Sequence, residues 1–424
     1  MSKFFLYLVL LLFLSNCGFK DKKVEENPNA ITLFEKSKPI EQELNPTLNI
    51  QISTITRGEP FLSSTSNNGG NADFNTNFEN AFSYKFSTIN QFKFYQPELL
   101  FTNDNSVIFF SGKGDIFKVS DNFEEYWKVN HYTKKEKKIK PILYFAQSGS
   151  DILVLDNLSK VYSIKLETGE LNWSIESKVG FNSNAKIIKN SVVAVDFDNV
   201  IRAFSVKDGK ELWNFDTDNP FIKSQKKLSL VTKGEVVFFI NSIGDVTALN
   251  ANDGSLVWQT PTQSTLIFQD AFTLENSDII FANDTIYFSN NRNEFFAIDA
   301  RSGVLKYKQT INSSLRPTVI EDYVFSISKE GFLFVIDDKT GNVLRITNIF
   351  KKIENKKKQI EPTGFILAQN KIYVSLNNGK LIKIDAISGN EEGFFKIGKS
   401  RINRPNVFND GMFILKSNAI IKAE

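Results

Sequence analysis

The side chains that most often carry out chemistry are scarce in this 424-residue chain, which has one cysteine, Cys17, and one histidine, His131. A single cysteine excludes an intramolecular disulfide and a cysteine-based zinc or iron–sulfur site, and a single histidine excludes a multi-histidine metal centre. His131 stands beside Tyr132 and the basic run 134–140, where an exposed loop residue is expected more than a general base. No nucleophile elbow, phosphate-binding loop, dinucleotide-binding glycine motif or zinc-protease motif occurs. We therefore expect no catalytic residue, no metal and no cofactor.

Cys17 could undergo a different reaction, the attachment of lipid to its thiol and amino group. It follows Phe4–Leu14, an apolar run that is too short for a membrane-spanning helix but suits the core of a signal peptide. The run ends in Leu-Ser-Asn-Cys, which resembles the lipobox of bacterial lipoproteins. The resemblance implies cleavage before Cys17 and acyl chains that hold the protein on a membrane. Gly18 replaces the aspartate of an inner-membrane retention signal, so we expect the periplasmic face of the outer membrane. The alternative is a free thiol after an ordinary signal peptide.

Three regions are expected along the chain: a signal peptide over 1–16, a lipidated and flexible tether over 17–80, and a folded domain over 81–424. The tether is rich in proline, serine, asparagine and glycine, and such a composition buries little surface. Residues 48–55 alternate well enough to predict one short strand there. The formal net charge of +3 is too balanced to indicate nucleic-acid binding.

The folded region is built from a repeated phrase. A strand-like run ends in a polar residue, a turn closes on a glycine, and an aromatic residue follows four positions later. The turn glycines are Gly169, Gly209, Gly254, Gly303, Gly341 and Gly389, spaced by 38 to 49 residues. Each copy divides into four short antiparallel strands, and a four-stranded sheet repeated at this period indicates a propeller. The residues expected to pack between neighbouring blades are Trp127, Trp173, Trp213, Trp258 and Tyr307.

Counting the copies predicts an all-β, eight-bladed propeller. An early copy around Val107–Trp127 lacks the turn glycine, and a copy from Met412 stops before its outer strand. The segment 81–87 can supply that strand and close the ring, with Tyr84 in the tryptophan position. Arg345 and Phe394–Phe395 stand near the aromatic position in two late copies, so looser docking is expected there.

The repeated phrase, Ala-x-Asp-x-x-Ser/Thr-Gly-x-x-x-Trp, resembles the tryptophan-docking repeat of PQQ-type propellers. Together with the lipobox and the segment Gly69–Ala72, the chain is similar to the BamB family of outer-membrane lipoproteins. The resemblance implies a non-enzymatic scaffold in β-barrel protein assembly. Its implied partners are the periplasmic (POTRA) domains of BamA, unfolded outer-membrane proteins, and a membrane held through the lipid anchor.

The resemblance also implies a partner-binding surface in the loops before the fourth and fifth blades. The candidates there are Leu228, Leu230, Lys226, Lys227, Asp270 and Glu275. The leucines could equally be core strand residues. Three basic clusters, 134–140, 223–227 and 356–358, are expected to be solvated loops, or contacts to acidic surfaces.

A rival interpretation is a periplasmic ligand-binding propeller, either quinoprotein-like or specific for a sugar or peptide. Quinoprotein dehydrogenases resemble this chain in their repeat. They usually carry vicinal cysteines and often a haem motif, which are missing from this sequence.

Overall fold

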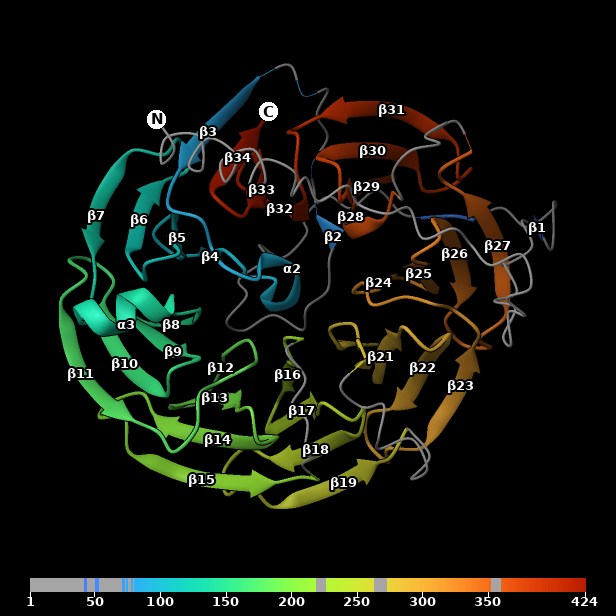
Figure 1. The fold of residues 1–424 in the computed structure, drawn as a ribbon. Helices are drawn as coiled ribbons and strands as arrows, with labels where there is room; N and C mark the ends of the chain where they lie inside the picture. Colours follow the sequence, from blue (N-terminus) through green and yellow to red (C-terminus); the bar gives the residue numbers. More distant parts are fainter. Residues whose placement is uncertain are drawn as a thin grey trace, which may run out of the picture. The chain divides into compact units, whose positions relative to one another are not determined.

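Short antiparallel strands make up nearly all of the regular structure, and they surround a common centre (Figure 1). The computed structural model describes residues 42–43, 50–52, 71–72, 74, 78, 80–218, 226–262, 273–351 and 360–424. All of these belong to one compact unit, Ile40–Glu424. Within the described residues the strands form eight sheets, each with four strands of the repeat. The expected eight-bladed propeller is therefore confirmed.

The first four blades follow one another along the chain, and in each the first strand lies innermost. Blade 1 comprises β4 (Leu100–Phe101), β5 (Ser106–Phe110), β6 (Ile116–Ser120) and β7 (Glu125–Val129). Blade 2 comprises β8 (Leu143–Ser148), β9 (Asp151–Asp156), β10 (Lys160–Lys165) and β11 (Leu171–Glu176). Blade 3 comprises β12 (Lys186–Ile188), β13 (Ser191–Val195), β14 (Val200–Ser205) and β15 (Glu211–Asp216). Blade 4 comprises β16 (Ser229–Lys233), β17 (Val236–Ile240), β18 (Val246–Asn250) and β19 (Leu256–Thr260).

The last four blades complete the ring. Blade 5 comprises β20 (Ile280–Ala282), β21 (Thr285–Asn290), β22 (Glu294–Asp299) and β23 (Leu305–Gln309). Blade 6 comprises β24 (Thr318–Ile320), β25 (Tyr323–Ile327), β26 (Phe332–Asp337) and β27 (Val343–Asn348). Blade 7 comprises β28 (Pro362–Ala368), β29 (Lys371–Leu376), β30 (Lys380–Asp385) and β31 (Glu391–Lys396). Blade 8 comprises β32 (Ile402–Phe408), β33 (Gly411–Lys416), β34 (Ala419–Ala423) and β3 (Ala81–Lys85).

The turn between the third and fourth strands is nearly identical in blades 2 to 7. Its glycine has φ between +72° and +75° in all six copies, a conformation that a residue with a Cβ rarely adopts. In blade 5, Asp299 starts the turn and its carboxylate accepts hydrogen bonds from the amides of Arg301 and Ser302 at 3.1 and 2.9 Å. In blade 1, Phe123 takes the left-handed position with φ of 66°. Its turn is one residue shorter, because the amide of Phe123 bonds the carbonyl of Ser120 three residues back, whereas the amide of Gly303 bonds the carbonyl of Asp299 four residues back.

The ring closes through pairing of the first and last strands of the propeller. β3 is antiparallel to β34, from Ala81 opposite Ala423 to Lys85 opposite Ala419. Tyr84 of β3 packs its ring against Phe109 and Phe117 of blade 1, with centroid distances of 5.4 and 5.7 Å. The predicted closure by an N-terminal strand is thus confirmed.

Pieces of the segment 17–80 pack on the propeller, so the expectation that this segment buries little surface is wrong for them. β1 (Gln42–Glu43) pairs with β27 at the outer edge of blade 6, and β2 (Asn71–Ala72) pairs in parallel with β28 at the inner edge of blade 7. Ile50 and Ile52 are buried in the core cluster that contains blade 6 residues. Residues 50–52 of the predicted strand 48–55 are not in a strand.

Two short helices complete the described structure. α2 (Phe92–Tyr95) lies at the centre of the ring, and α3 (Lys134–Ile139) lies over blade 2 (Figure 1). α3 begins at Thr133 with a capping box, because Thr133 and Glu136 bond to each other's backbone amides. Neither of these helices has the length and apolarity of a membrane-spanning segment.

Candidate functional site at the centre of the ring

The segment that joins β3 to β4 enters the centre of the ring and places α2 there (Figure 1). Phe92 and Tyr95 of this helix are buried against the inner strands. The amide of Lys227, which precedes the innermost strand of blade 4, donates a hydrogen bond to the carbonyl of Phe94 at 3.2 Å. The segment before blade 1 is therefore attached to the start of blade 4.

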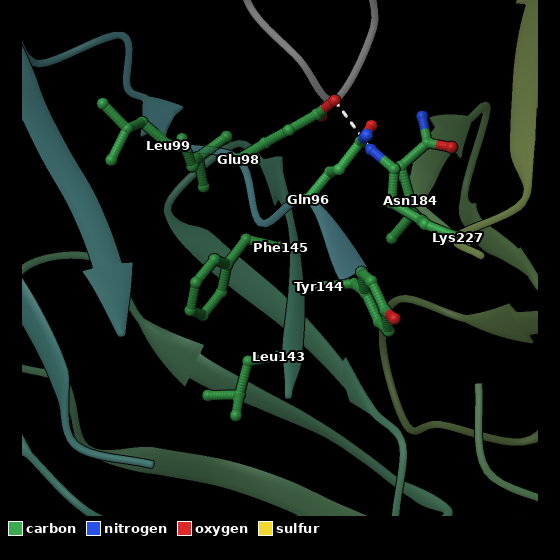
Figure 2. Close-up of a pocket in the computed structure, with 10 residues that line it drawn as sticks. Gln96, Glu98, Leu99, Leu143, Tyr144, Phe145, Asn184 and Lys227 are labelled. Carbon is green, nitrogen blue, oxygen red and sulfur yellow. Dashed lines mark hydrogen bonds and ion pairs between the residues drawn. The ribbon is translucent and has the colours of Figure 1, made fainter. Parts of the chain in front are cut away.

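A network of ion pairs lies beside α2. Glu98 Oε1 is 2.8 Å from Lys227 Nζ and 2.5 Å from an Arg316 nitrogen. Arg316 also donates from Nε to Asp278 at 2.9 Å. Figure 2 shows Glu98 reaching Lys227 above a cavity whose wall includes Tyr144 and Phe145. Glu98 thus connects blade 1 to blades 4 and 6 across the centre of the ring.

The charges in this network stabilise one another. Burial would raise the pKa of Glu98, but the positive charges of Lys227 and Arg316 outweigh it and lower the pKa to about 2. The same two cations hold the pKa of Asp278 well below its usual range, although burial again acts in the opposite direction. Both carboxylates are therefore ionised at neutral pH.

Further cations surround these carboxylates. Lys186 is fully buried at the start of β12, and burial lowers its pKa to about 7. Burial also lowers the pKa of Lys226 to about 8, and it lowers the pKa of Arg404. Among the described residues, cations predominate over carboxylates near the centre. This environment favours the binding of an anion.

The predicted partner-binding residues are mostly buried. Leu228 and Leu230 lie in the core between blades 3 and 4, which agrees with the alternative that they are core residues. Lys226 and Lys227 are buried at the ring centre, so the expectation that they lie in a solvated loop is wrong. Glu275 is half-buried, and Asp270 lies outside the described residues, as do 223–225 and 356–358 of the basic clusters. The structure does not gather these side chains into one exposed surface.

The predicted blade-docking residues lie at the junctions between neighbouring blades. In each of four junctions a tryptophan Nε1 donates a hydrogen bond of 3.0 Å to the carbonyl three residues before the next blade's turn glycine. The pairs are Trp127 with Leu166, Trp173 with Val206, Trp213 with Ala251, and Trp258 with Ala300. Tyr307 covers Gly341 in the same way with its ring.

At the two late junctions, for which looser docking is expected, other residues stand in the tryptophan's place. Arg345 lies over Gly389, and its guanidinium donates a hydrogen bond to the carbonyl of Ala386 at 2.8 Å. This bond corresponds to the one that a tryptophan makes at the four earlier junctions. In blade 7 the corresponding position is Gly393, opposite Lys383. The ring of Phe395 lies over Gly393. Phe78 packs on Phe395 at 4.4 Å between ring centroids and on Tyr373 at 5.8 Å. An aromatic residue from the N-terminal segment thus packs against the apolar cluster that blades 7 and 8 share.

His131 is half-buried rather than fully exposed. Its Nε2 lies 3.1 Å from the carbonyl oxygen of Gly169. Burial lowers the pKa of His131, which keeps the ring neutral at neutral pH. In the described part of the chain, no group of three or more histidine, cysteine or acidic residues could hold a metal ion.

Sequence reasoning missed Glu98, Asp278, Arg316 and Lys186. Each lies at the start of an innermost strand, or one or two residues before it. Parallel placement of equivalent strands around the ring brings these positions together. The repeat alignment could have found them, because each is a charged residue that leads into an apolar run.

The tryptophan-docked blades and the closed ring define a PQQ-type β-propeller. Residues 112–347 match the family described as outer membrane protein assembly factor BamB, and the chain belongs to this family. It is 19% identical to the BamB of Moranella endobia over 278 residues, which cover 65% of this chain and 70% of that protein. It is 30% identical to the Salmonella typhimurium BamB over 118 residues, which cover 26% of this chain and 30% of that protein.

Solved structures agree in fold. BamB from Moraxella catarrhalis superposes with a TM-score of 0.64 at 15% identity, covering 81% of this chain and all of that one. A europium-containing methanol dehydrogenase also gives a TM-score of 0.64, at 8% identity, covering 82% of this chain and 87% of that one. Because both an assembly factor and an enzyme share the architecture, function must be argued from surfaces and sites.

Proposed function

We propose that this protein is a non-enzymatic scaffold of outer-membrane protein assembly. In this role it binds the periplasmic POTRA domains of BamA and assists the folding and insertion of β-barrel proteins. Membership of the BamB family supports the general process. The observation that supports a scaffold in this chain is the outer rim of the ring, which offers apolar side chains beside open strand edges.

Exposed aliphatic residues occur on the outermost strands of four consecutive blades. Leu171, Leu212, Leu256 and Leu305 are 46 to 51% exposed, and they belong to blades 2, 3, 4 and 5. We call these four residues the apolar rim. Single exposed leucines need no explanation, and we infer an interaction surface from their recurrence near the start of four neighbouring edge strands.

The outer edge of a blade can accept another strand. In blade 6, β1 pairs with β27 through Gln42 opposite Ile346 and Glu43 opposite Arg345. Addition of an extended segment to a sheet edge is a general mode of peptide recognition. The rim of blades 2 to 5 combines such edges with apolar side chains, and it would suit an extended, partly apolar strand of an unfolded outer-membrane protein.

A pull-down from solubilised native envelopes tests the partner. The tagged full-length chain is expected to co-purify BamA, and Leu256→Asp with Leu305→Asp is expected to reduce recovery of unfolded barrel proteins severalfold. Ile139→Asp is a matched control, because Ile139 is 62% exposed but lies on α3, away from the rim. Failure of the wild-type chain to recover BamA would refute the proposed partner.

We further propose that residues 1–16 are a signal peptide, that 17–80 link the anchor to the propeller, and that 81–424 are the propeller. Lipid on Cys17 would then hold the ring at the periplasmic face of the outer membrane. Residues 1–16 and Cys17 lie outside the described residues. Mass spectrometry of the mature N-terminus tests this: Cys17→Ala is expected to abolish acylation and release the protein from membranes.

A second candidate is a periplasmic ligand-binding propeller of the PQQ type. The cavities at the centre of the ring and the excess of cations there favour it. A thermal-shift measurement with PQQ and calcium distinguishes the two proposals. Saturable stabilisation accompanied by dye-linked dehydrogenase activity would favour the second.

A further inference from the structure

Another cavity opens between α2 and the starts of blades 4 to 8. Phe94 and Lys93 of α2 form one side of it, and Leu315, Lys226 and Arg401 belong to the other. Phe94 is 36% exposed, whereas Leu315 is buried. The cavity therefore combines an apolar surface with positive charge.

Arg401 is the unusual member of this lining. It lies immediately before β32 and is half-buried, and burial lowers its pKa although Glu361 and Glu275 oppose the effect. Among the described residues, the Arg401 guanidinium makes no hydrogen bond and no ion pair within 4 Å, and its Nε is buried. A buried donor such as this Nε is costly without a partner, and a bound anion would remove that cost.

The charges around the cavity restrict the kind of anion. The described lining residues include the cations Lys93, Lys226, Lys329 and Arg401 and the carboxylates Glu275 and Glu361. Lys329 is already paired with Glu361 at 3.5 Å. The remaining excess of positive charge is small, and two carboxylates stand nearby. A singly charged carboxylate fits this balance better than a phosphate dianion, which the carboxylates would repel.

We propose that this cavity binds the carboxylate of a ligand whose neighbouring group is apolar. Arg401 receives the carboxylate through its planar fork of donors, and Phe94 and Leu315 contact the apolar group. Such a ligand is either a small free acid or the C-terminal end of a polypeptide with an apolar last residue. The site is separate from the apolar rim, so this proposal does not depend on the proposed scaffold function.

Calorimetric titration of the full-length chain with N-acetylphenylalanine tests the site. Saturable binding is expected, whereas N-acetylphenylalanine amide, which lacks the charge, and acetate, which lacks the apolar group, should bind at least tenfold more weakly. Inorganic phosphate should also bind more weakly. Equal binding of the amide, tighter binding of phosphate, or no binding of the acid would overturn the proposal.

Two variants assign the binding to these residues. Arg401→Gln is expected to weaken N-acetylphenylalanine binding at least tenfold, while Lys134→Gln on α3 removes the same charge without effect. Phe94→Ala should weaken binding of N-acetylphenylalanine but leave acetate binding unchanged, and because Phe94 is partly exposed this variant is expected to fold. Unchanged affinity in both Arg401→Gln and Phe94→Ala would exclude the cavity.

A short peptide ending in phenylalanine, with a free or an amidated C-terminus, distinguishes the two sources of the ligand. Binding of the free peptide alone identifies a polypeptide end as a ligand. If only the small acid binds, the ligand is a free acid. Rim variants such as Leu256→Asp should bind N-acetylphenylalanine as tightly as the wild type, so loss of the scaffold function and loss of this site give different results.

Discussion

Arg345 donates a hydrogen bond to the carbonyl of Ala386 at 2.8 Å, in the place where four other junctions use a tryptophan. Arg345→Met should keep most of the packing but lose the charged donor, and we expect the free energy of unfolding to fall by about 1.5–3 kcal/mol. Urea unfolding followed by tryptophan fluorescence measures this. Arg301→Met is the control, because Arg301 is 80% exposed. Arg345→Trp, which restores a ring donor, should recover much of the loss; no recovery would mean that only the arginine fits there.

Trp258 combines a buried ring with a donor to Ala300. Trp258→Phe retains much of the ring and should cost about 1 kcal/mol for the lost hydrogen bond, whereas Trp258→Ala should cost about 3–5 kcal/mol. Thermal unfolding compares the two variants. Tyr126→Ala on the outer strand of blade 1, where Tyr126 is 59% exposed, should change stability little. Equal losses of stability in Trp258→Phe and Trp258→Ala would contradict separate contributions from the buried ring and the hydrogen bond.

Phe78 packs at the junction where Gly393 provides no side chain. Phe78→Ala should lower the free energy of unfolding by about 1–2 kcal/mol, because the contact with Phe395 is lost. A double-mutant cycle with Phe395→Ala should show a coupling of about 0.5–1.5 kcal/mol. Phe82→Ala, at a site that is 51% exposed, serves as the control. Additive effects of Phe78→Ala and Phe395→Ala would show that the rings do not stabilise each other.

Glu98 should make stability depend on acid pH. Its pKa is about 2 in the folded chain and near 4.5 when unfolded, so its contribution is complete above about pH 4.5 and is lost as the pH falls towards 2. Glu98→Gln should cost about 3 kcal/mol at pH 7, because Lys227 and Arg316 lose a buried counter-charge, and much less near pH 2. Unfolding by urea at pH 2 to 7 measures the difference. The exposed Glu170→Gln should not reproduce it, and a cost independent of pH would contradict the assignment.

Lys186 should make stability depend on pH in the alkaline range, because burial lowers the pKa of its amino group. Its pKa of about 7 lies below the ordinary lysine value of 10.5, so between these values the unfolded chain binds more protons and stability rises with pH. Each pH unit within this window is worth at most about 1.4 kcal/mol. Lys186→Met should flatten the rise between pH 7 and 10, measured by denaturant unfolding. Identical slopes in wild type and variant would contradict the prediction.

The architecture was predictable because the docking phrase couples a turn to an inter-blade contact. Gly303 and Trp258 are far apart in sequence. Because the same turn glycine and the same aromatic position recur along the chain, the blade repeat can be recognised although a single turn would not reveal it. The replacement of tryptophan by Arg345 was not interpretable in advance, since an arginine at an edge strand is usually solvated. Only the position of the Ala386 carbonyl explains it.

The central site was less predictable. Lys226 and Lys227 stand in a basic run that is typical of exposed loops, and burial becomes evident only when Glu98 approaches from the other side of the ring. Likewise Phe74 and Phe78 lie in a polar segment of low complexity. Their contacts to Tyr373 depend on the path of the chain and not on a local pattern.

The pairing of Ala81 with Ala423 joins strands from opposite ends of the propeller sequence. The chain is synthesised from its N-terminus, so β3 is made long before its partner β34. Closing so long a loop is entropically expensive and is among the slowest steps of folding. Until β3 and β34 pair, the edges of both strands are available to other chains. A holdase that shields β3 until the last blade arrives would raise the yield of this protein more than that of a propeller whose blades each contain strands from one stretch of sequence.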